Sequence, residues 1–212
     1  PGLVRRLSPD GHSIVGALTP EADAEGAKTA RLAELLACVD TATPTRNLAG
    51  VKWSKLVVNS MRNGLSGLTG MSGRERDNDP ATVRLGMMLG AQAVQTGRAM
   101  GLELVNTSFD FEALAATARG DTGAIAAMAT RMAEIAAARG ADQRPSMGQD
   151  IRKGRRTETD WINGLVAHHG RAHGVEVSAH EQVNALMHRI ERGEMAPSPL
   201  LAREILEALG AA

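Results

Sequence analysis

A lysine and two asparagines recur at four-residue spacing in one apolar segment. Lys55, Asn59 and Asn63 stand at i, i+4 and i+8 within residues 51–65. On a helix this spacing places the three side chains on nearly the same face, drifting by about 40° per step. An ammonium group can stabilise negative charge and donate a proton, and amides can bind a polar group without adding charge. The segment therefore predicts a helix face that holds a small polar ligand.

A second dense group of polar residues lies in the segment 144–177, which contains Ser146, Asp150 and Glu158. A helix start near Thr157 would place Glu158 in the first turn, where a carboxylate favours the positive end of the helix dipole. Ser146 could equally cap a helix or contact a ligand. Asp150 could make local hydrogen bonds or belong to a site. The segment is thus a candidate partner for the first one.

The first motif also has a structural interpretation. Lys55 could extend along a helix edge and keep its amine in water. Asn59 and Asn63 could form ordinary hydrogen bonds between helices, and Glu158 could serve its helix terminus alone. We read the basic residues 152, 153, 155 and 156 as a solvated face. Metal binding is not expected, because the histidines at 168, 169, 173 and 180 lack a ligand spacing with supporting carboxylates.

Composition restricts the class of protein. The chain has 212 residues, of which 43% are apolar, enough for a proper core. Its 24 basic and 24 acidic residues cancel, which argues against a general binder of nucleic acid or anionic membrane. No run of 18 apolar residues or signal peptide is visible. The single cysteine allows no internal disulfide, which fits a reducing compartment. We expect a cytoplasmic protein.

Hydrophobic periodicity and turn residues predict a mainly α chain with a short α/β start. We expect strands over 2–7 and 12–18, a helix from Pro20 to about Val39, and an extended piece over 40–45. The remainder predicts helices over 48–70, 80–101, 111–117, 121–139, 157–174, 178–193 and 198–209. At least part of the stretch 140–156 is expected to be loop. The chain starts at Pro1, in a strand-like segment, and we expect it to be an internal segment of a longer protein.

Together the two motifs resemble the ketopantoate reductase (2-dehydropantoate 2-reductase) family. The first stretch has the pattern Trp53-x-Lys55-Leu56-x-x-Asn59-x-x-x-Asn63. The second has Ser146-Met147-x-Gln149-Asp150-Ile151, then Gly154-Arg155-x-Thr157-Glu158-x-Asp160-x-Ile162-Asn163-Gly164. Their separation of about a hundred residues also fits. The resemblance implies the helical C-terminal domain of a 6-phosphogluconate-dehydrogenase-like reductase over 47–212. It also implies that residues 1–46 are a remnant of the nucleotide-binding (Rossmann) domain.

The resemblance also implies roles for individual residues. Lys55 matches the catalytic lysine, which donates the proton. Asn59, Asn63 and Ser146 match substrate-binding positions. Asp150 belongs to the same motif and is assigned to the substrate side with them. Glu158 matches the glutamate that contacts the cofactor side of the cleft and helps order the site. The implied reaction is reduction of 2-dehydropantoate to pantoate with NADPH. Burial would lower the pKa of the lysine and a nearby carboxylate would raise it.

Two departures from the family stand in the sequence. The fingerprint G-x-G-x-x-G is absent, so we expect most of the NADP(H) site to lie outside this chain, which should not bind NADPH normally by itself. Gly73 stands where the resemblance leads us to expect a polar substrate-side residue in some members of the family. Two alternatives therefore remain: a reductase of another 2-oxo acid, or a helical packing or dimerisation module. The expected partner is a small 2-oxo acid. Self-association as a homodimer stays open, as does preference for NADP over NAD.

Overall fold

The computed structural model describes residue 2 and residues 11–138 and 140–211. The chain divides into two compact units, Pro1–Lys52 and Trp53–Ala212. The predicted strand over 2–7 lies outside the described residues, except for Gly2. No helix in the described part of the chain is both long and apolar enough to cross a membrane.

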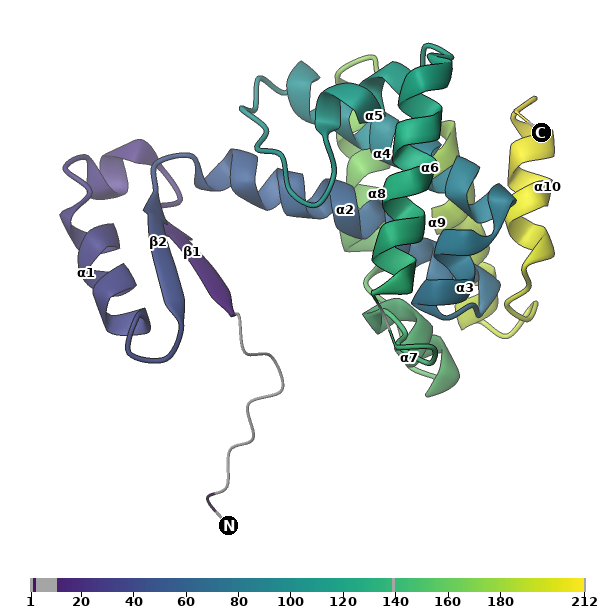
Figure 1. Cartoon of the computed structure of the whole chain (residues 1–212), viewed down its shortest axis with the longest axis horizontal. Coiled ribbons are helices and arrows are strands. Elements are labelled where there is room, and N and C mark those ends of the chain that lie inside the picture. Colours follow the sequence, from purple (N-terminus) through teal and green to yellow (C-terminus); the bar gives the residue numbers. More distant parts are fainter. Residues whose placement is uncertain (1, 3–10, 139, 212) are drawn as a thin grey trace. The chain divides into compact units, whose positions relative to one another are not determined.

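The first unit contains a two-stranded parallel sheet. Strand β1 (His12–Gly16) pairs with β2 (Thr41–Thr45), with His12 opposite Thr41 and Gly16 opposite Thr45. Helix α1 (Ala27–Leu36) forms the crossover that parallel strands require (Figure 1). Both strands agree with the sequence prediction for 12–18 and 40–45.

The single helix predicted from Pro20 to Val39 is wrong. A short 3-10 helix, η1 (Pro20–Asp23), comes first, and α1 begins only at Ala27. Between them Gly26 has φ 77°, in the left-handed region that a continuous helix cannot contain. The Asp23 carboxylate accepts hydrogen bonds from the backbone N–H groups of Lys28 and Thr29, at 3.1 and 2.6 Å. This side chain satisfies the free donors of the second helix start.

The second unit is built from helices. In chain order they are α2 (Leu48–Thr69), which begins in the first unit, α3 (Gly73–Asn78), α4 (Pro80–Ala99), α5 (Phe111–Thr117), α6 (Thr122–Ala137), α7 (Ser146–Arg152), α8 (Thr159–Ala172), α9 (Ser178–Glu191) and α10 (Leu200–Ala208). Every helix predicted after residue 47 is present, with ends shifted by at most two residues. The prediction of a mainly α chain with a small α/β segment is confirmed.

Two short helices were not predicted. Helix α3 starts with a capping box, in which the Glu75 N–H donates to Ser72 Oγ and the Ser72 N–H donates to Glu75 Oε2. Helix α7 occupies the middle of the stretch 140–156, part of which was expected to be loop. Both have only six or seven residues, so packing against other helices has to stabilise them.

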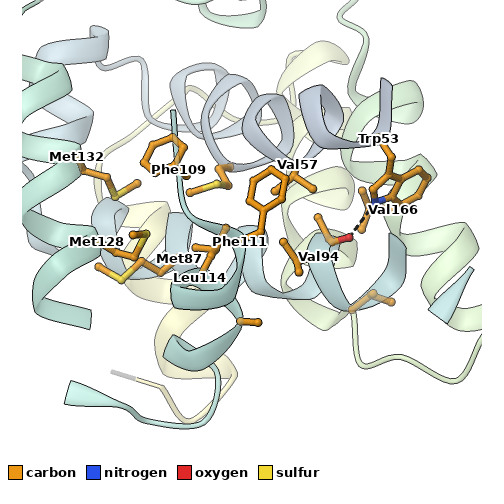
Figure 2. Close-up of a cluster of buried hydrophobic side chains, with 14 of the residues drawn as sticks. Trp53, Val57, Met87, Val94, Phe109, Phe111, Leu114, Met128, Met132 and Val166 are labelled. Carbon is orange, nitrogen blue, oxygen red and sulfur yellow. Dashed lines mark hydrogen bonds between the residues drawn. The ribbon is translucent and has the colours of Figure 1, made fainter. Parts of the chain in front are cut away.

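Helix α2 supplies the central face of the core. Val57, Met61 and Leu65 recur every four residues on it, and all three are fully buried. Figure 2 shows one of the two hydrophobic clusters, where Trp53 and Val57 pack with aromatic and methionine side chains from α4, α5, α6 and the segment before α5. The Trp53 indole N–H donates to the Ala93 carbonyl at 2.9 Å, which satisfies the polar end of a buried side chain.

A buried ion cluster joins α2 to α3. The Asp77 carboxylate accepts hydrogen bonds from Arg62 on α2 and from Arg76 Nε, the latter at 2.8 Å. Arg76 Nη1 also donates to the Arg62 carbonyl at 2.9 Å and to Ser66 Oγ at 2.8 Å. Arg62, Arg76 and Asp77 are only 5%, 1% and 2% exposed. Because a buried charge is costly without a partner, the three residues depend on one another.

We therefore expect Asp77→Asn to destabilise the helical unit by about 3 kcal/mol or more, since both arginines lose a buried countercharge. Urea unfolding followed by circular dichroism measures the change. Glu134→Gln is the matched control, because it removes the countercharge of an exposed pair with Arg131 at 3.0 Å. Such a pair contributes little. An unfolding free energy for Asp77→Asn equal to that of the control would contradict a structural role for the cluster.

Candidate functional site

The polar stripe lies on the side of α2 opposite its core face. Lys55, Asn59 and Asn63 each precede by two residues a member of the buried row on this helix, which corresponds to a rotation of about 200°. Lys55 is exposed, and both asparagines are half-buried. The shared face expected from the spacing is therefore present, and α2 packs on one side while offering an amine and two amides on the other.

Helix α7 meets this stripe at Asn63. The amide Nδ2 of Asn63 lies 3.5 Å from Ser146 Oγ, across 83 positions of sequence. Ser146 is the first residue of α7, and Pro145 occupies the N-cap position without a side-chain hydrogen bond. The alternative that Ser146 caps this helix is therefore wrong. Its exposed hydroxyl is instead directed to the stripe.

A small polar hollow of about 200 Å³ opens beside this contact. Its lining consists of Val58, Asn59, Arg62, Asn63, Gln143, Arg144 and Pro145. One wall thus comes from α2 and the other from the segment before α7. The backbone N–H of Gly73 donates to the Gln143 carbonyl at 2.8 Å, which holds that second wall against the start of α3. A hollow with amides and guanidinium groups suits an oxygen-rich, anionic ligand.

The other three predicted site residues stand apart from this contact. Among the described residues, the side chains of Lys55, Asp150 and Glu158 form no hydrogen bond or ion pair. Asp150 is half-buried, one turn after Ser146 on α7. Glu158 is exposed at the N-cap position of α8 rather than in its first turn, and its side chain makes no capping bond. The expectation that the helix starts near Thr157 is corrected to Thr159.

Helix α9 fixes the start of α8, and with it the backbone of Glu158. The N–H and hydroxyl of Thr157 both donate to Glu191 Oε1, at 2.6 and 2.7 Å. Burial alone would raise the pKa of Glu191, but these hydrogen bonds outweigh it and lower that pKa. Thr159 adds a hydrogen bond to Asn184 at 2.9 Å. Glu158 therefore projects from a well-anchored turn, although its own carboxylate is unengaged.

Asn163 connects α8 to the back of the stripe helix. Its Nδ2 donates to the Ser60 carbonyl on α2 at 3.1 Å and lies 3.2 Å from His180 Nδ1. A Cβ on Gly64 would come within 2.5 Å of Asn163 Oδ1, so the absence of a side chain there permits this approach. His180 Nε2 lies 2.9 Å from the Leu89 carbonyl, so Nε2 carries the proton and Nδ1 accepts from Asn163.

Arg62, Gln143 and Arg144 belong to the hollow and were not predicted as site residues. Arg62 lies between the two asparagines in sequence, and Arg144 precedes Ser146 by two positions. Their closeness to the motifs was a usable signal. Spacing alone did not identify them. Arg62 does not belong to the i, i+4, i+8 series of the stripe, and Arg144 lies in a segment that was expected to be loop. Within the described residues, no group of three or more His, Cys, Asp or Glu side chains is placed to bind a metal.

The second unit is thus a helical fold with a small polar hollow, and comparisons with known proteins identify its family. The model of the family described as "Ketopantoate reductase PanE/ApbA C terminal" matches residues 47–191. The chain therefore belongs to the PanE/ApbA ketopantoate reductase family, in agreement with the resemblance of the two motifs.

Several solved structures share this fold. A PanE/ApbA family ketopantoate reductase from Ralstonia eutropha JMP134 is 23% identical, with a TM-score of 0.64 over 87% of this chain and 53% of that one. D-mandelate dehydrogenase in complex with NADH is 20% identical, with a TM-score of 0.69 over 88% and 56%. A dimeric ketopantoate reductase from Staphylococcus aureus is 17% identical, with a TM-score of 0.60 over 79% and 52%. The chain spans about half the length of these proteins.

The buried His180 generates a prediction about acid stability. Desolvation lowers its pKa from 6.5 to about 4. As the pH falls, the unfolded chain therefore binds a proton at this histidine before the folded chain does. The contribution of the neutral His180 to the free energy of unfolding is full above pH 6.5 and is lost as the pH falls toward 4. When the pH falls from about 7.5 to about 5, we expect this histidine to lower the free energy of unfolding by about 2 kcal/mol.

Urea unfolding of the wild type and of His180→Gln at both pH values measures this effect. Burial also lowers the pKa of His169, which acts in the same direction, so only the difference between the two proteins is assigned to His180. His180→Gln should start less stable but lose less stability on acidification. An equal loss in both proteins would show that His180 does not cause the acid sensitivity.

Proposed function

We propose that this chain is the substrate-binding half of a nicotinamide-dependent reductase of 2-oxo acids. The observation that supports this most directly is the row of Lys55, Asn59 and Asn63 on one face of α2, with Ser146 Oγ 3.5 Å from the last amide. Membership of the PanE/ApbA family supports the same class of reaction. Within that class, the first candidate reaction is reduction of 2-dehydropantoate to pantoate with NADPH.

In this proposal Lys55 is the general acid. When a ketone carbon gains a hydride, its oxygen becomes negatively charged, and a nearby ammonium group stabilises that charge and then donates its proton. The amides of Asn59 and Asn63 and the hydroxyl of Ser146 bind and orient the polar groups of the substrate. None of these three adds a charge that would compete with the ammonium group. Asp150 is assigned to the substrate side with them.

NADPH, when bound, supplies the hydride. The residue of this chain that we assign to it is Glu158, whose exposed carboxylate forms no bond to another described residue and is an acceptor for donors of a ribose or carboxamide. We assign residues 1–46 to the end of the nucleotide-binding domain and residues 47–212 to the catalytic domain. The cytoplasmic location remains a prediction.

A different 2-oxo acid is the second candidate substrate. Two observations favour it: the likeness in fold to D-mandelate dehydrogenase, and the presence of Arg144 in the lining of the hollow with the two asparagines. Kinetics with a panel of 2-oxo acids, measured on the whole reductase with NADPH, separates the two candidates. A kcat/KM for 2-dehydropantoate well above that for every other acid supports the first.

The central test is Lys55→Met in the whole reductase. We expect kcat to fall by about 10²–10⁴-fold, because the proton donor is lost while the exposed position costs the fold little. The matched control is Lys153→Met, which removes an exposed lysine at the end of α7. Circular dichroism checks that both variants fold. Turnover of Lys55→Met close to that of Lys153→Met would refute Lys55 as the acid.

A third possibility is that the chain acts only in helical packing or dimerisation, as the dimeric state of the Staphylococcus aureus relative suggests. Titration of NADPH into the 212-residue chain tests our expectation that most of the cofactor site lies outside this chain. We expect no micromolar binding, because the sequence contains no G-x-G-x-x-G segment and contributes one carboxylate. Micromolar affinity would contradict that expectation. A chain that self-associates, in a whole protein that reduces no 2-oxo acid, would favour the packing module.

A further inference from the structure

The polar hollow continues the stripe of α2 on the side away from Lys55. Its lining includes Asn59 and Asn63 but not Lys55. These asparagines lie roughly 6 and 12 Å beyond Lys55 along the helix axis. Helical side chains lean toward the N-terminus, so the amine of Lys55 extends away from the hollow. A group bound in the hollow is therefore remote from the atom that Lys55 protonates.

Arg144 contributes a positive charge to this hollow, and no described carboxylate forms an ion pair with it. One Nη of Arg144 donates to the Gly70 carbonyl, at the end of α2. Its Nε is buried, with no hydrogen-bond partner among the described residues. A guanidinium with a buried, unused N–H is costly unless an acceptor reaches it.

Glu75, the carboxylate on which the charge of Arg144 acts, is already engaged elsewhere. Glu75 accepts hydrogen bonds in the capping box of α3, with Ser72 N at 2.7 Å from Glu75 Oε2. Those hydrogen bonds are the main reason why the pKa of Glu75 is lowered, and the charge of Arg144 adds to the effect. Arg62 also lines the hollow, but its guanidinium is paired with the buried carboxylate of Asp77. The hollow is therefore polarised to accept an anion.

A 2-oxo acid has its first carboxylate bonded directly to the carbonyl carbon, so that group must stay near Lys55. We propose that the hollow binds a second carboxylate at the far end of the substrate, and that Arg144 determines this specificity. The preferred substrate class is then a 2-oxo dicarboxylic acid. This inference rests on the proposed function, and it favours the second candidate substrate over 2-dehydropantoate, whose far end is a neutral hydroxyl.

The first test compares kcat/KM for 2-oxoglutarate and 2-oxopentanoate, which have the same number of carbons and differ in the terminal carboxylate. In the whole reductase with NADPH, the wild type should prefer 2-oxoglutarate. Arg144→Gln should lose about ten- to hundredfold with 2-oxoglutarate and change little with 2-oxopentanoate. Arg144→Lys should keep part of the preference, because the charge remains without the guanidinium geometry. The matched control is Arg152→Gln, which removes an exposed arginine of α7.

Several results would overturn the inference while leaving the proposed function intact. These are a preference of the wild type for 2-oxopentanoate or 2-dehydropantoate, or an equal loss with both five-carbon acids in Arg144→Gln. Reduction of none of the acids by the wild type would count against the proposed function instead.

A second test needs neither cofactor nor turnover. Titration of glutarate, a dicarboxylate without a reducible carbonyl, into the 212-residue chain should shift the NMR signals of the Asn59 and Asn63 side-chain amides. The shifts should persist in Arg152→Gln and disappear in Arg144→Gln. Unchanged amide signals in the wild type would overturn the inference whatever the kinetics show.

Discussion

The carboxylate of Asp77, buried between two guanidinium groups, is the interaction on which the arrangement of α2 and α3 depends. It ties a six-residue helix, too short to be stable alone, to the helix that carries the polar stripe. The same contact fixes Arg62 and, through the hydrogen bond of Arg76 to the Arg62 carbonyl, the backbone of α2 at the hollow. One wall of the hollow is thus held in place by an ion pair, whereas most of α2 is held by apolar packing.

Helix α2 works because two periodic rows of side chains point in opposite directions. The row of Val57, Met61 and Leu65 is fully buried, whereas the opposite row is exposed at Lys55 and half-buried at the two asparagines. A rigid helix of 22 residues therefore positions the amine relative to the amides without help from loops. Close contact with α8, made possible at Gly64, adds a hydrogen bond from Asn163 to the Ser60 carbonyl that limits rotation of α2 about its axis.

The sequence predicted well what depends on local pattern and poorly what depends on distant contacts. The long helices and the common face of Lys55, Asn59 and Asn63 followed from periodicity. The break at Gly26 was missed, because the sequence does not reveal whether a glycine inside a helical pattern adopts a helical or a left-handed backbone conformation. Helix α3 had a readable capping box, but α7 depends on packing that only the folded chain provides. Arg144 was missed because it lies in a segment read as loop, and the burial of its Nε without a partner among the described residues is visible only in the folded chain.

The chain has two tryptophans and no tyrosine, and both tryptophans lie in the helical unit. Trp53 is buried, with its ring edge against His169 at a centroid distance of 5.7 Å, whereas Trp161 on α8 is 73% exposed. Ultraviolet emission of the protein is therefore the sum of one apolar and one aqueous fluorophore. It reports on the helical unit alone, and the sheet of β1 and β2 is spectroscopically silent in it. Trp53 lies two residues from Lys55 in the sequence, and Trp161 lies three residues from Glu158. Each of these two proposed site residues therefore has a tryptophan fluorophore close to it in the chain.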